Sequence, residues 1–324
     1  MKKIESSQIF DFRSTADQGS AQAQRFLGRP YDLIREMLRA IYIGLKLRAI
    51  SVLRKHTPYN RLGDKLICLL DFYVWHGRIP TNELIFNDVI HKIKTTDEII
   101  NPLRVFVTDK ELVKVFVKAV VGDQCNVPTH AVLRSMDEVR KYAFPSECCI
   151  KATHGCGHVI IRKNGKDIVF KEIERWFAIN YYRKHREANY KTLKPKIIVE
   201  PLIFGRPDPN DYKFFCYKGS PKLIKVVTDR HTNYGCKYFD DKWVEQDFSI
   251  THEKSSGPIH CPGNFKEMLS IAAALSAYFS FVRIDLYSNG DKCLVGEITN
   301  CSESAGGKFI PKSGEQVASK LIFG

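Results

Sequence analysis

The stretch FVRIDLYSNGDKCLVGEIT (281–299) constrains the fold more than any other part of the chain. Asn289–Gly290 is a dipeptide favoured in tight β-turns, and the segments on either side have the apolar character of strands. The first strand carries Asp285 and the second carries Glu297. A simple turn would place Asp285 opposite residue 294, whereas a longer or bulged turn would bring Glu297 nearer. The sequence therefore predicts a hairpin with a carboxylate on each strand.

Two carboxylates in apolar strands need compensating partners, because an unpaired buried charge is costly. Magnesium is one such partner, since it takes one or two carboxylates and completes its shell with phosphate and water. The alternative is an ion pair between Asp285 and either Arg283 or a lysine. The residues alone leave both interpretations open.

The net charge of +14 over 324 residues predicts an anionic partner, which includes nucleic acid, nucleotide, acidic glycan and anionic lipid. We do not expect nucleic acid, because the basic residues are spread thinly and the sequence has neither zinc-finger spacing nor an RRM signature. The hydrophobic content of 44% is ordinary for a globular protein with one large core or a few smaller ones.

The ten cysteines are expected to be reduced and mostly buried, because cysteine is far scarcer here than in a disulfide scaffold. The chain begins without an apolar signal segment, and it has no run near the roughly 20 apolar residues that span a bilayer. These features predict a cytoplasmic protein.

Residues 31–55 predict a basic amphipathic helix, with apolar side chains at helical spacing and a crowd of arginines and lysines on the other side. Such a helix can bind the inner face of a membrane, or it can pack on its own domain with a solvated basic face. We favour the second interpretation. Residues 1–60 are expected to form an N-terminal extension.

The rest of the sequence predicts mainly helices up to about residue 142 and mainly strands, with some helices, after it. Helices are expected over 81–95, with Thr81 as N-cap, and over 108–122, with Thr108 and Glu111 as a capping box and Gly122 at the end. Further helices are expected over 134–142, 168–187 and 265–279. Strands or hairpins are expected over 127–133, 148–163, 195–203, 211–230 and 281–299.

The stretch CIKATHGCGHVIIR (149–162) has two interpretations. Four potential zinc ligands lie within ten residues, namely Cys149, His154, Cys156 and His158. The same stretch reads as two strands joined by a glycine-bearing turn, which would let backbone N–H groups approach a phosphate beside a lysine. Zinc sites usually come as paired cysteine elements, so we favour the phosphate hairpin.

Glu200 ends an apolar strand in KIIVEPLIF, where its carboxylate could accept from an adenine amino group. Asp211, at the start of DYKFF, could hold a ribose hydroxyl.

The order and spacing of TDK (108–110), IKATHGCGHVII, KPKIIVEPLI…DYKFFCYKGSPKLI and FVRIDLY…VGEIT resemble the ATP-grasp enzymes. More narrowly, they resemble the TupA-like branch, named after teichuronopeptide biosynthesis. The resemblance covers about 61–324 and is specific over 145–300. It implies a fold of mixed α+β or α/β class, in which two α+β subdomains clasp ATP. The expected divisions are a preceding region over 61–142, a subdomain with the phosphate-covering hairpin over 143–200, and one with the metal-binding hairpin over 201–324.

The resemblance also implies roles for individual residues, with ATP and one or two Mg²⁺ ions as cofactors. The ATP-binding set is Lys110 and Lys151 on the phosphates, Gly155 and Gly157 in the covering loop, Glu200 and the backbone near Leu202 on adenine, Asp211 on ribose, and Lys213 near the nucleotide. The metal set is Asp285 and Glu297, and the transferred phosphate would meet Arg283 and Arg230. Many ATP-grasp enzymes have Asn two residues after the metal glutamate. Here Thr299 stands there, which leaves the second metal ion open.

The activity implied by the resemblance is carboxylate–amine ligation through an acyl phosphate, with release of ADP and phosphate. The TupA-like branch further implies a uronic-acid carboxyl of a surface glycan or precursor, such as capsule or lipopolysaccharide, joined to an amino acid or amine. Candidate substrate contacts lie in a basic–aromatic stretch, whose alternative is a solvated helix end: Tyr182, Arg186, Tyr190 and Lys191.

Two other classes remain open. A glycan-modifying kinase or glycosyltransferase would also use a nucleotide, although DPNDY (208–212) is a poor substitute for the usual metal motif of glycosyltransferases. A degenerate binding module would not need Lys151, Asp285 and Glu297, all of which are present.

Overall fold

The computed structural model describes residue 48 and residues 50–206, 209–228 and 235–324. The chain divides into two units, Met1–His56 and Thr57–Gly324. In the first unit the described residues, 48 and 50–56, are helical. Most of the helix expected over 31–55 therefore lies outside the described residues. Within the described part of the chain, no helix is long and apolar enough to cross a membrane.

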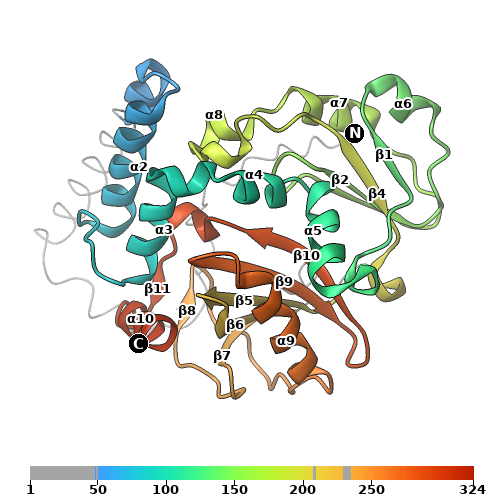
Figure 1. Cartoon of the computed structure of the whole chain (residues 1–324). Coiled ribbons are helices and arrows are strands. Elements are labelled where there is room, and N and C mark those ends of the chain that lie inside the picture. Colours follow the sequence, from blue (N-terminus) through green and yellow to red (C-terminus); the bar gives the residue numbers. More distant parts are fainter. Residues whose placement is uncertain (1–47, 49, 207–208, 229–234) are drawn as a thin grey trace, which may run out of the picture. The chain divides into compact units, whose positions relative to one another are not determined.

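The second unit contains a five-stranded antiparallel sheet in the order β10-β9-β5-β6-β7 (Figure 1). Its strands are β5 (Asp211–Tyr217), β6 (Ser220–Thr228), β7 (Gly235–Asp240), β9 (Phe281–Ser288) and β10 (Cys293–Thr299). The hairpins expected around Lys218–Gly219 and Asn289–Gly290 are both confirmed. Helix α9 (Phe265–Ser276) packs on one face, where alternate strand residues bury the largest apolar core.

The opposite face of this sheet carries a second core. Helices α3 (Phe86–Thr95) and α10 (Gly314–Phe323) contribute to it, together with the short strands β8 (Ser249–Ile250) and β11 (Phe309–Ile310). The ring of Phe86 lies at its centre, with ring centroids of Phe215 and Phe309 each 5.4 Å away. This core covers only part of the face, and charged side chains occupy the rest.

A smaller antiparallel sheet has the order β1-β4-β2-β3. Its strands are β1 (Ala131–Leu133), β2 (Cys148–Ala152), β3 (Val159–Arg162) and β4 (Ile197–Glu200). Helices α6 (Met136–Lys141) and α7 (Phe170–Ala178) bury its apolar side chains. Because β1 belongs to this sheet, the sheet extends across the subdomain boundary expected at residue 142.

Several helix boundaries differ from the expectation. The helix expected over 108–122 begins later, as α5 (Leu112–Val121), and Gly122 ends it with φ 95°. Thr108 is instead the last residue of the preceding helix α4 (Pro102–Thr108). The expected capping box is wrong, because the Asp109 carboxylate accepts from the backbone N–H groups of Glu111 and Leu112.

Thr81 is also not an N-cap, because α3 begins at Phe86. The Thr81 N–H and hydroxyl instead donate to Asp88. The helix expected over 168–187 is divided into α7 and α8 (Tyr181–His185). The remaining elements are α2 (Arg61–His76) and the short helices η2 (Asp97–Ile100), η3 (Asp123–Cys125), η4 (Ala188–Tyr190), η5 (Ile203–Gly205) and η6 (Ser302–Ala305).

All ten cysteines are free thiols, and most of them are buried. The expectation that most of the cysteines are buried is therefore confirmed.

Candidate active site

The two carboxylates of the β9–β10 hairpin face each other. Asp285 pairs with Glu297 because the register shifts between Val295 and Glu297. The residue gained in this bulge is Gly296. A Cβ atom there would lie 2.5 Å from Cε2 of Tyr287, so the close approach of the Tyr287 ring requires glycine. The bulge expected as one possibility is thus the arrangement that forms.

Asp285 is buried and fully engaged by cations. Its carboxylate accepts from Nε and Nη2 of Arg283, at 2.7 and 2.8 Å, and from Nζ of Lys213 at 2.6 Å. Burial alone would raise the pKa of Asp285, but the two cations outweigh it and lower the pKa to about 2. The ion pair considered as an alternative to metal binding is therefore present in this structure.

Glu297 is less constrained. Its Oε1 accepts from the Thr299 hydroxyl at 2.7 Å, and that hydroxyl accepts from Nη2 of Arg283 at 3.0 Å. Burial would raise the pKa of Glu297, but the Lys110 ammonium and the Arg283 guanidinium outweigh it and lower the pKa. The carboxylate is therefore ionised and stands between Thr299 and the Lys110 side of the site.

Asn300 does not substitute for the asparagine common in ATP-grasp enzymes. Its amide is buried and donates to the Arg104 carbonyl at 3.2 Å and the Thr108 hydroxyl at 3.1 Å. Its Oδ1 accepts from Nη1 of Arg104 at 2.9 Å. Asn300 thus fixes β10 to α4, while Thr299 takes the position beside Glu297.

The donor chemistry of the carboxylate pair suits a magnesium ion that shares its shell with phosphate and water, but both oxygens of Asp285 are taken by Arg283 and Lys213 in this state, so a metal ion would have to displace these cations. Asp285 and Glu297 supply hard oxygen ligands from neighbouring strands, which is the usual protein contribution to such an ion. Among the described residues, no group of three or more His, Cys, Asp or Glu side chains could hold a metal by itself. The four candidate zinc ligands of residues 149–158 are therefore not brought together, and His154 instead hydrogen-bonds the Trp176 carbonyl at 2.9 Å.

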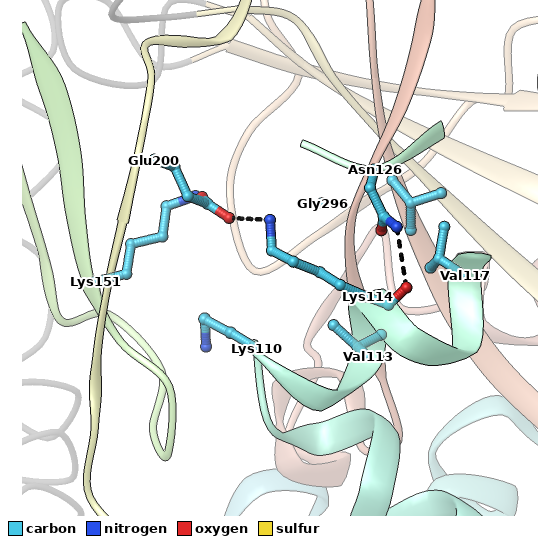
Figure 2. Close-up of a pocket in the computed structure, with 9 residues that line it drawn as sticks. Lys110, Val113, Lys114, Val117, Asn126, Lys151, Glu200 and Gly296 are labelled. Atoms are coloured by element: carbon cyan, nitrogen blue, oxygen red, sulfur yellow. Dashed lines mark hydrogen bonds and ion pairs between the residues drawn. The ribbon is translucent and has the colours of Figure 1, made fainter. Parts of the chain in front are cut away.

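A pocket is lined by residues of both sheets, as Figure 2 shows. Its lining comes from β2 and β4 of the small sheet, from β10 of the large sheet and from α5 with its flanking residues: Lys110, Val113, Lys114, Val117, Asn126, Lys151, Glu200, Val295 and Gly296. Glu200 lies in its wall between two ammonium groups, 2.7 Å from Nζ of Lys151 and 2.6 Å from Nζ of Lys114.

Glu200 acts as an anchor for these lysines. Burial would raise its pKa, but Lys151 and Lys114 outweigh burial and lower it. Because both carboxylate oxygens are engaged, Glu200 in this state orients Lys151 rather than facing a base. The sequence analysis missed Lys114, although its position four residues after Lys110 is a spacing that places two side chains on one helical face.

Lys110 ties the β2–β3 loop to the start of α5. Its Nζ donates to the Gly155 carbonyl at 2.7 Å, and its backbone N–H donates to the Thr153 carbonyl at 3.3 Å. Gly157, further along the loop, has φ 80°. The loop thereby lies on the same side as Glu297. Burial raises the pKa of the Cys156 thiol in this loop, and the nearby Glu297 carboxylate raises it further.

The other expected residues fall in different places. Leu202 lies next to η5, directly after Glu200 and Pro201. Asp211 shares Nζ of Lys213 with Asp285, at 2.6 Å from each carboxylate. Arg230 lies outside the described residues.

The expected substrate contacts Tyr182 and Arg186 point into the interior. The Tyr182 hydroxyl donates to Asp64 at 2.9 Å. Arg186 is 0% exposed, and its guanidinium donates to Asp64 and to the carbonyls of Thr57 and Pro58. These two side chains hold the chain that leads into α2, so a direct contact with substrate is not open to Arg186.

The remaining two expected contacts differ from each other. Lys191 donates to the Tyr59 carbonyl at 3.4 Å and lies near the surface. The Tyr190 ring lies against the Tyr181 ring, with centroids 4.4 Å apart and the planes tilted by 44°. Burial raises the pKa of Tyr190, and the nearby carboxylates of Glu187 and Glu297 raise it further, which places Tyr190 on the side of the hairpin carboxylates.

The model of a family described as TupA-like ATPgrasp matches residues 90–322, which is more than half of the chain. A comparison with curated proteins finds no match. Among solved structures, D-alanine–D-alanine ligase from Bacillus anthracis complexed with ATP is 17% identical with a TM-score of 0.35, over 67% of this chain and 62% of that chain. ATP-grasp ligase PsnB with a phosphomimetic precursor variant, Mg and ADP is 10% identical with a TM-score of 0.36, over 64% and 53%.

D-cycloserine synthetase DcsG is 14% identical with a TM-score of 0.36, over 68% of this chain and 70% of that chain. The present chain spans less than two thirds of the D-alanine ligase chains that it matches.

Proposed function

Because the chain belongs to the TupA-like ATP-grasp family, we propose that it is an ATP-dependent carboxylate–amine ligase. The observation that supports this most is the pocket lined by both sheets, with lysines on one side and the hairpin carboxylates near the other. A nucleoside triphosphate needs both the lysines and the carboxylates, since its phosphates require cations and its metal ion requires hard oxygen ligands.

In this proposal Lys151 and Lys110 contact the phosphates of ATP, and the loop with Gly155 and Gly157 covers them. Glu200 positions Lys151 through their 2.7 Å ion pair. The backbone near Leu202 faces adenine, because it continues from the strand end that carries Glu200.

Asp211 and Lys213 lie at the start of β5, on the same side of the large sheet as Asp285. We place Asp211 near the ribose and Lys213 beside the nucleotide. Asp285 and Glu297 would hold one or two Mg²⁺ ions, with Thr299 assisting through a water. When bound, magnesium would neutralise the phosphate charge and orient the transferred group.

The reaction has two steps in which the protein forms no covalent bond. A substrate carboxylate oxygen attacks the γ-phosphorus, the bond to the β-phosphate oxygen breaks, and an acyl phosphate and ADP result. The amine then attacks the acyl carbon, phosphate leaves and the amine loses a proton. Arg283 lies at the carboxylate pair and would neutralise the negative charge of the phosphoryl group during transfer. Arg230 is proposed to share this role. The contribution of the chain is positioning and charge neutralisation.

The substrate class rests on the family. We propose a uronic-acid-type carboxyl of a surface glycan or precursor as the acid and an amino acid or amine as the nucleophile. The net charge of +14 is compatible with an anionic nucleotide and an acidic glycan, and nucleic acid is not proposed as a partner. Tyr190 and Lys191 remain proposed substrate contacts. A cytoplasmic location is part of the same proposal. Membrane contact through residues 31–55 is the less favoured alternative, and it requires that deletion of residues 1–55 abolish binding to liposomes.

The test is a screen for ADP release with ATP and Mg²⁺, in which uronic acids are crossed with amines. Release that needs both an acid and an amine supports ligation. Lys151→Met should remove it, whereas Lys166→Met, at an exposed position just after the same hairpin, should not. ADP release without an amine, with a stable phosphorylated product, would instead identify a kinase. Turnover of a sugar nucleotide in place of ATP would identify a glycosyltransferase.

A further inference from the structure

The Glu200 carboxylate in the wall of the pocket is shared between two lysines that come from different parts of the fold (Figure 2). Lys151 lies on β2, and its Nζ is 2.7 Å from Oε2 of Glu200. Lys114 lies on α5, and its Nζ is 2.6 Å from Oε1. The side chain of Glu200 is only 6% exposed, so both cations act on a carboxylate that has little access to water.

The two lysines reach Glu200 from opposite directions. Lys151 shares a face of the small sheet with Glu200, because it pairs with Ile198, two residues before Glu200 on β4. Lys114 instead reaches across from a helix whose apolar side chains belong to the core of the large sheet: Val113, Phe116 and Val117. The ion pair of Lys114 with Glu200 therefore links the small sheet to the core of the large one.

Lys114 is fixed by further contacts. Its Nζ also donates to the Val127 carbonyl at 2.5 Å, and its backbone carbonyl accepts from Nδ2 of Asn126 at 2.9 Å. The Lys114 ammonium therefore lies between two oxygen acceptors, one neutral and one charged. Burial would lower the pKa of Lys151, but the Glu200 carboxylate outweighs it and raises the pKa, so Lys151 is charged as well.

A phosphate contact by Lys151 changes the balance of charge at Glu200. In the proposed function the Lys151 ammonium binds a phosphate of ATP, so its charge is withdrawn from Glu200 in part or in full. A buried carboxylate that loses its cation is costly, because no water replaces the lost partner. Lys114 prevents this loss, since its contact with Oε1 does not depend on where the Lys151 ammonium points.

We propose that Lys114 is a positioning residue for the nucleotide, and that it keeps Glu200 neutralised while the Lys151 ammonium contacts a phosphate. This inference rests on the proposed ligase function and adds a residue to its machinery. Lys114 acts through Glu200 and Lys151 and itself touches no part of the nucleotide. Its contribution therefore requires phosphates on the ligand, and it disappears when residue 200 carries no charge.

A direct contact between Lys114 and a phosphate is the alternative. The structure favours the indirect role, because the Lys114 ammonium already lies between the Val127 carbonyl and the Glu200 carboxylate. The two roles predict different behaviour in Glu200→Gln. A direct contact with phosphate would persist in that variant, whereas a role through Glu200 would be lost, since a neutral amide needs no cation.

The test compares a ligand that has phosphates with one that has none. Wild type and Lys114→Met are titrated by calorimetry with Mg²⁺ and a non-hydrolysable ATP analogue, and adenosine is measured by its competition with that analogue. We expect Lys114→Met to weaken binding of the analogue by at least about tenfold and to leave adenosine within about twofold of wild type. A residue that only supported the fold would affect both ligands alike.

Glu200→Gln provides the second comparison. In that background Lys114→Met should change binding of the ATP analogue by no more than about twofold, and this comparison decides the proposal if adenosine binds too weakly to measure. Lys118→Met, one turn further along α5, is the matched control, because the Lys118 side chain is 65% exposed and pairs with Asp123. Lys114→Gln, which loses the charge but keeps hydrogen-bond donors, replaces Lys114→Met if the latter does not fold.

The positioning role is overturned if Lys114→Met binds the ATP analogue as tightly as wild type does, or if it weakens adenosine by the same factor. It is also overturned if Lys114→Met weakens the analogue equally in wild type and in Glu200→Gln, a result that would identify a direct contact with phosphate. Failure of the analogue to bind wild type is a different result, because it contradicts the proposed ligase function itself and the role of Lys114 with it.

Discussion

Glu297 lies directly across from Asp285 because β10 gains one residue, Gly296, between Val295 and Glu297. Without this bulge the pairing would slip by one position, and the side chain of Glu297 would turn to the other face of the sheet. The proposed metal site therefore depends on a glycine that carries no ligand atom.

Gly296→Ala is expected to disturb this arrangement. The new Cβ would lie 2.5 Å from Cε2 of Tyr287, so the ring or the strand must move. We expect a loss of about 1–3 kcal/mol in unfolding free energy, measured by urea denaturation, and a marked loss of ATP-dependent activity. The same substitution at Gly290, whose Cβ has open space, tests for a general intolerance of the hairpin, although its φ of 99° adds backbone strain. Full activity of Gly296→Ala would contradict the importance of the bulge.

Neutralising the two carboxylates should affect stability unequally. Asp285→Asn removes the common partner of Arg283 and Lys213 and should cost about 3 kcal/mol of unfolding free energy. Glu297→Gln alters a carboxylate that accepts a hydrogen bond from Thr299, and it should cost about 1 kcal/mol. Both should abolish ADP release. Equal losses of stability, or activity retained in Glu297→Gln, would disagree with the geometry.

Acid stability gives a further test of Asp285. Its pKa is lowered from 3.8 to about 2, because Arg283 and Lys213 outweigh the effect of burial. Between these values the folded protein binds fewer protons than the unfolded chain, so the contribution of Asp285 is complete above pH 3.8 and is lost as pH falls towards 2. The contribution is about 2 kcal/mol. Unfolding free energies from pH 5 downward should fall more gently in Asp285→Asn than in wild type, and parallel curves would refute this assignment.

The two glycines of the β2–β3 loop should respond differently to alanine. Gly157 has φ 80°, and a Cβ added there would meet no atom within 4 Å, so Gly157→Ala brings backbone strain of about 1 kcal/mol and no clash. The Cβ of Gly155→Ala would lie 3.1 Å from Nδ1 of His158, a contact that a small ring movement relieves. We expect Gly157→Ala to raise KM for ATP more than Gly155→Ala does, as measured by initial rates. The reverse order would mean that the loop does not need its left-handed residue.

Much of the fold could be predicted from local signals. The hairpins at 211–230 and 281–299 are marked by turn residues between apolar segments, and both form. Helix starts are harder to predict, because an aspartate and a threonine cap equally well in isolation. At Asp109 and Thr81 the tertiary contacts decide which residue caps and where the helix begins.

Only part of the candidate site could be predicted, because tertiary contacts decide which side chains face the pocket. Lys110, Lys151 and Glu200 line one pocket, and Lys110 also donates to the Gly155 carbonyl, while their contacts with ATP stay predictions. The ion pair of Lys114 with Glu200 could not be predicted, because the two residues are far apart in sequence and only the fold brings them within 2.6 Å. The expectation for Arg186 is wrong, because sequence alone does not distinguish a basic helix end in solvent from one that is buried against Asp64.

The most direct test of the central claim is calorimetric binding of Mg-ATP to wild type, Lys151→Met and Glu297→Gln. We predict that wild type binds Mg-ATP in preference to UDP- or GDP-sugars, and that each substitution weakens binding by at least about tenfold. Lys166→Met, the exposed control just after the same hairpin, should bind as wild type does. Absence of Mg-ATP binding, or binding of a sugar nucleotide in its place, would contradict the account.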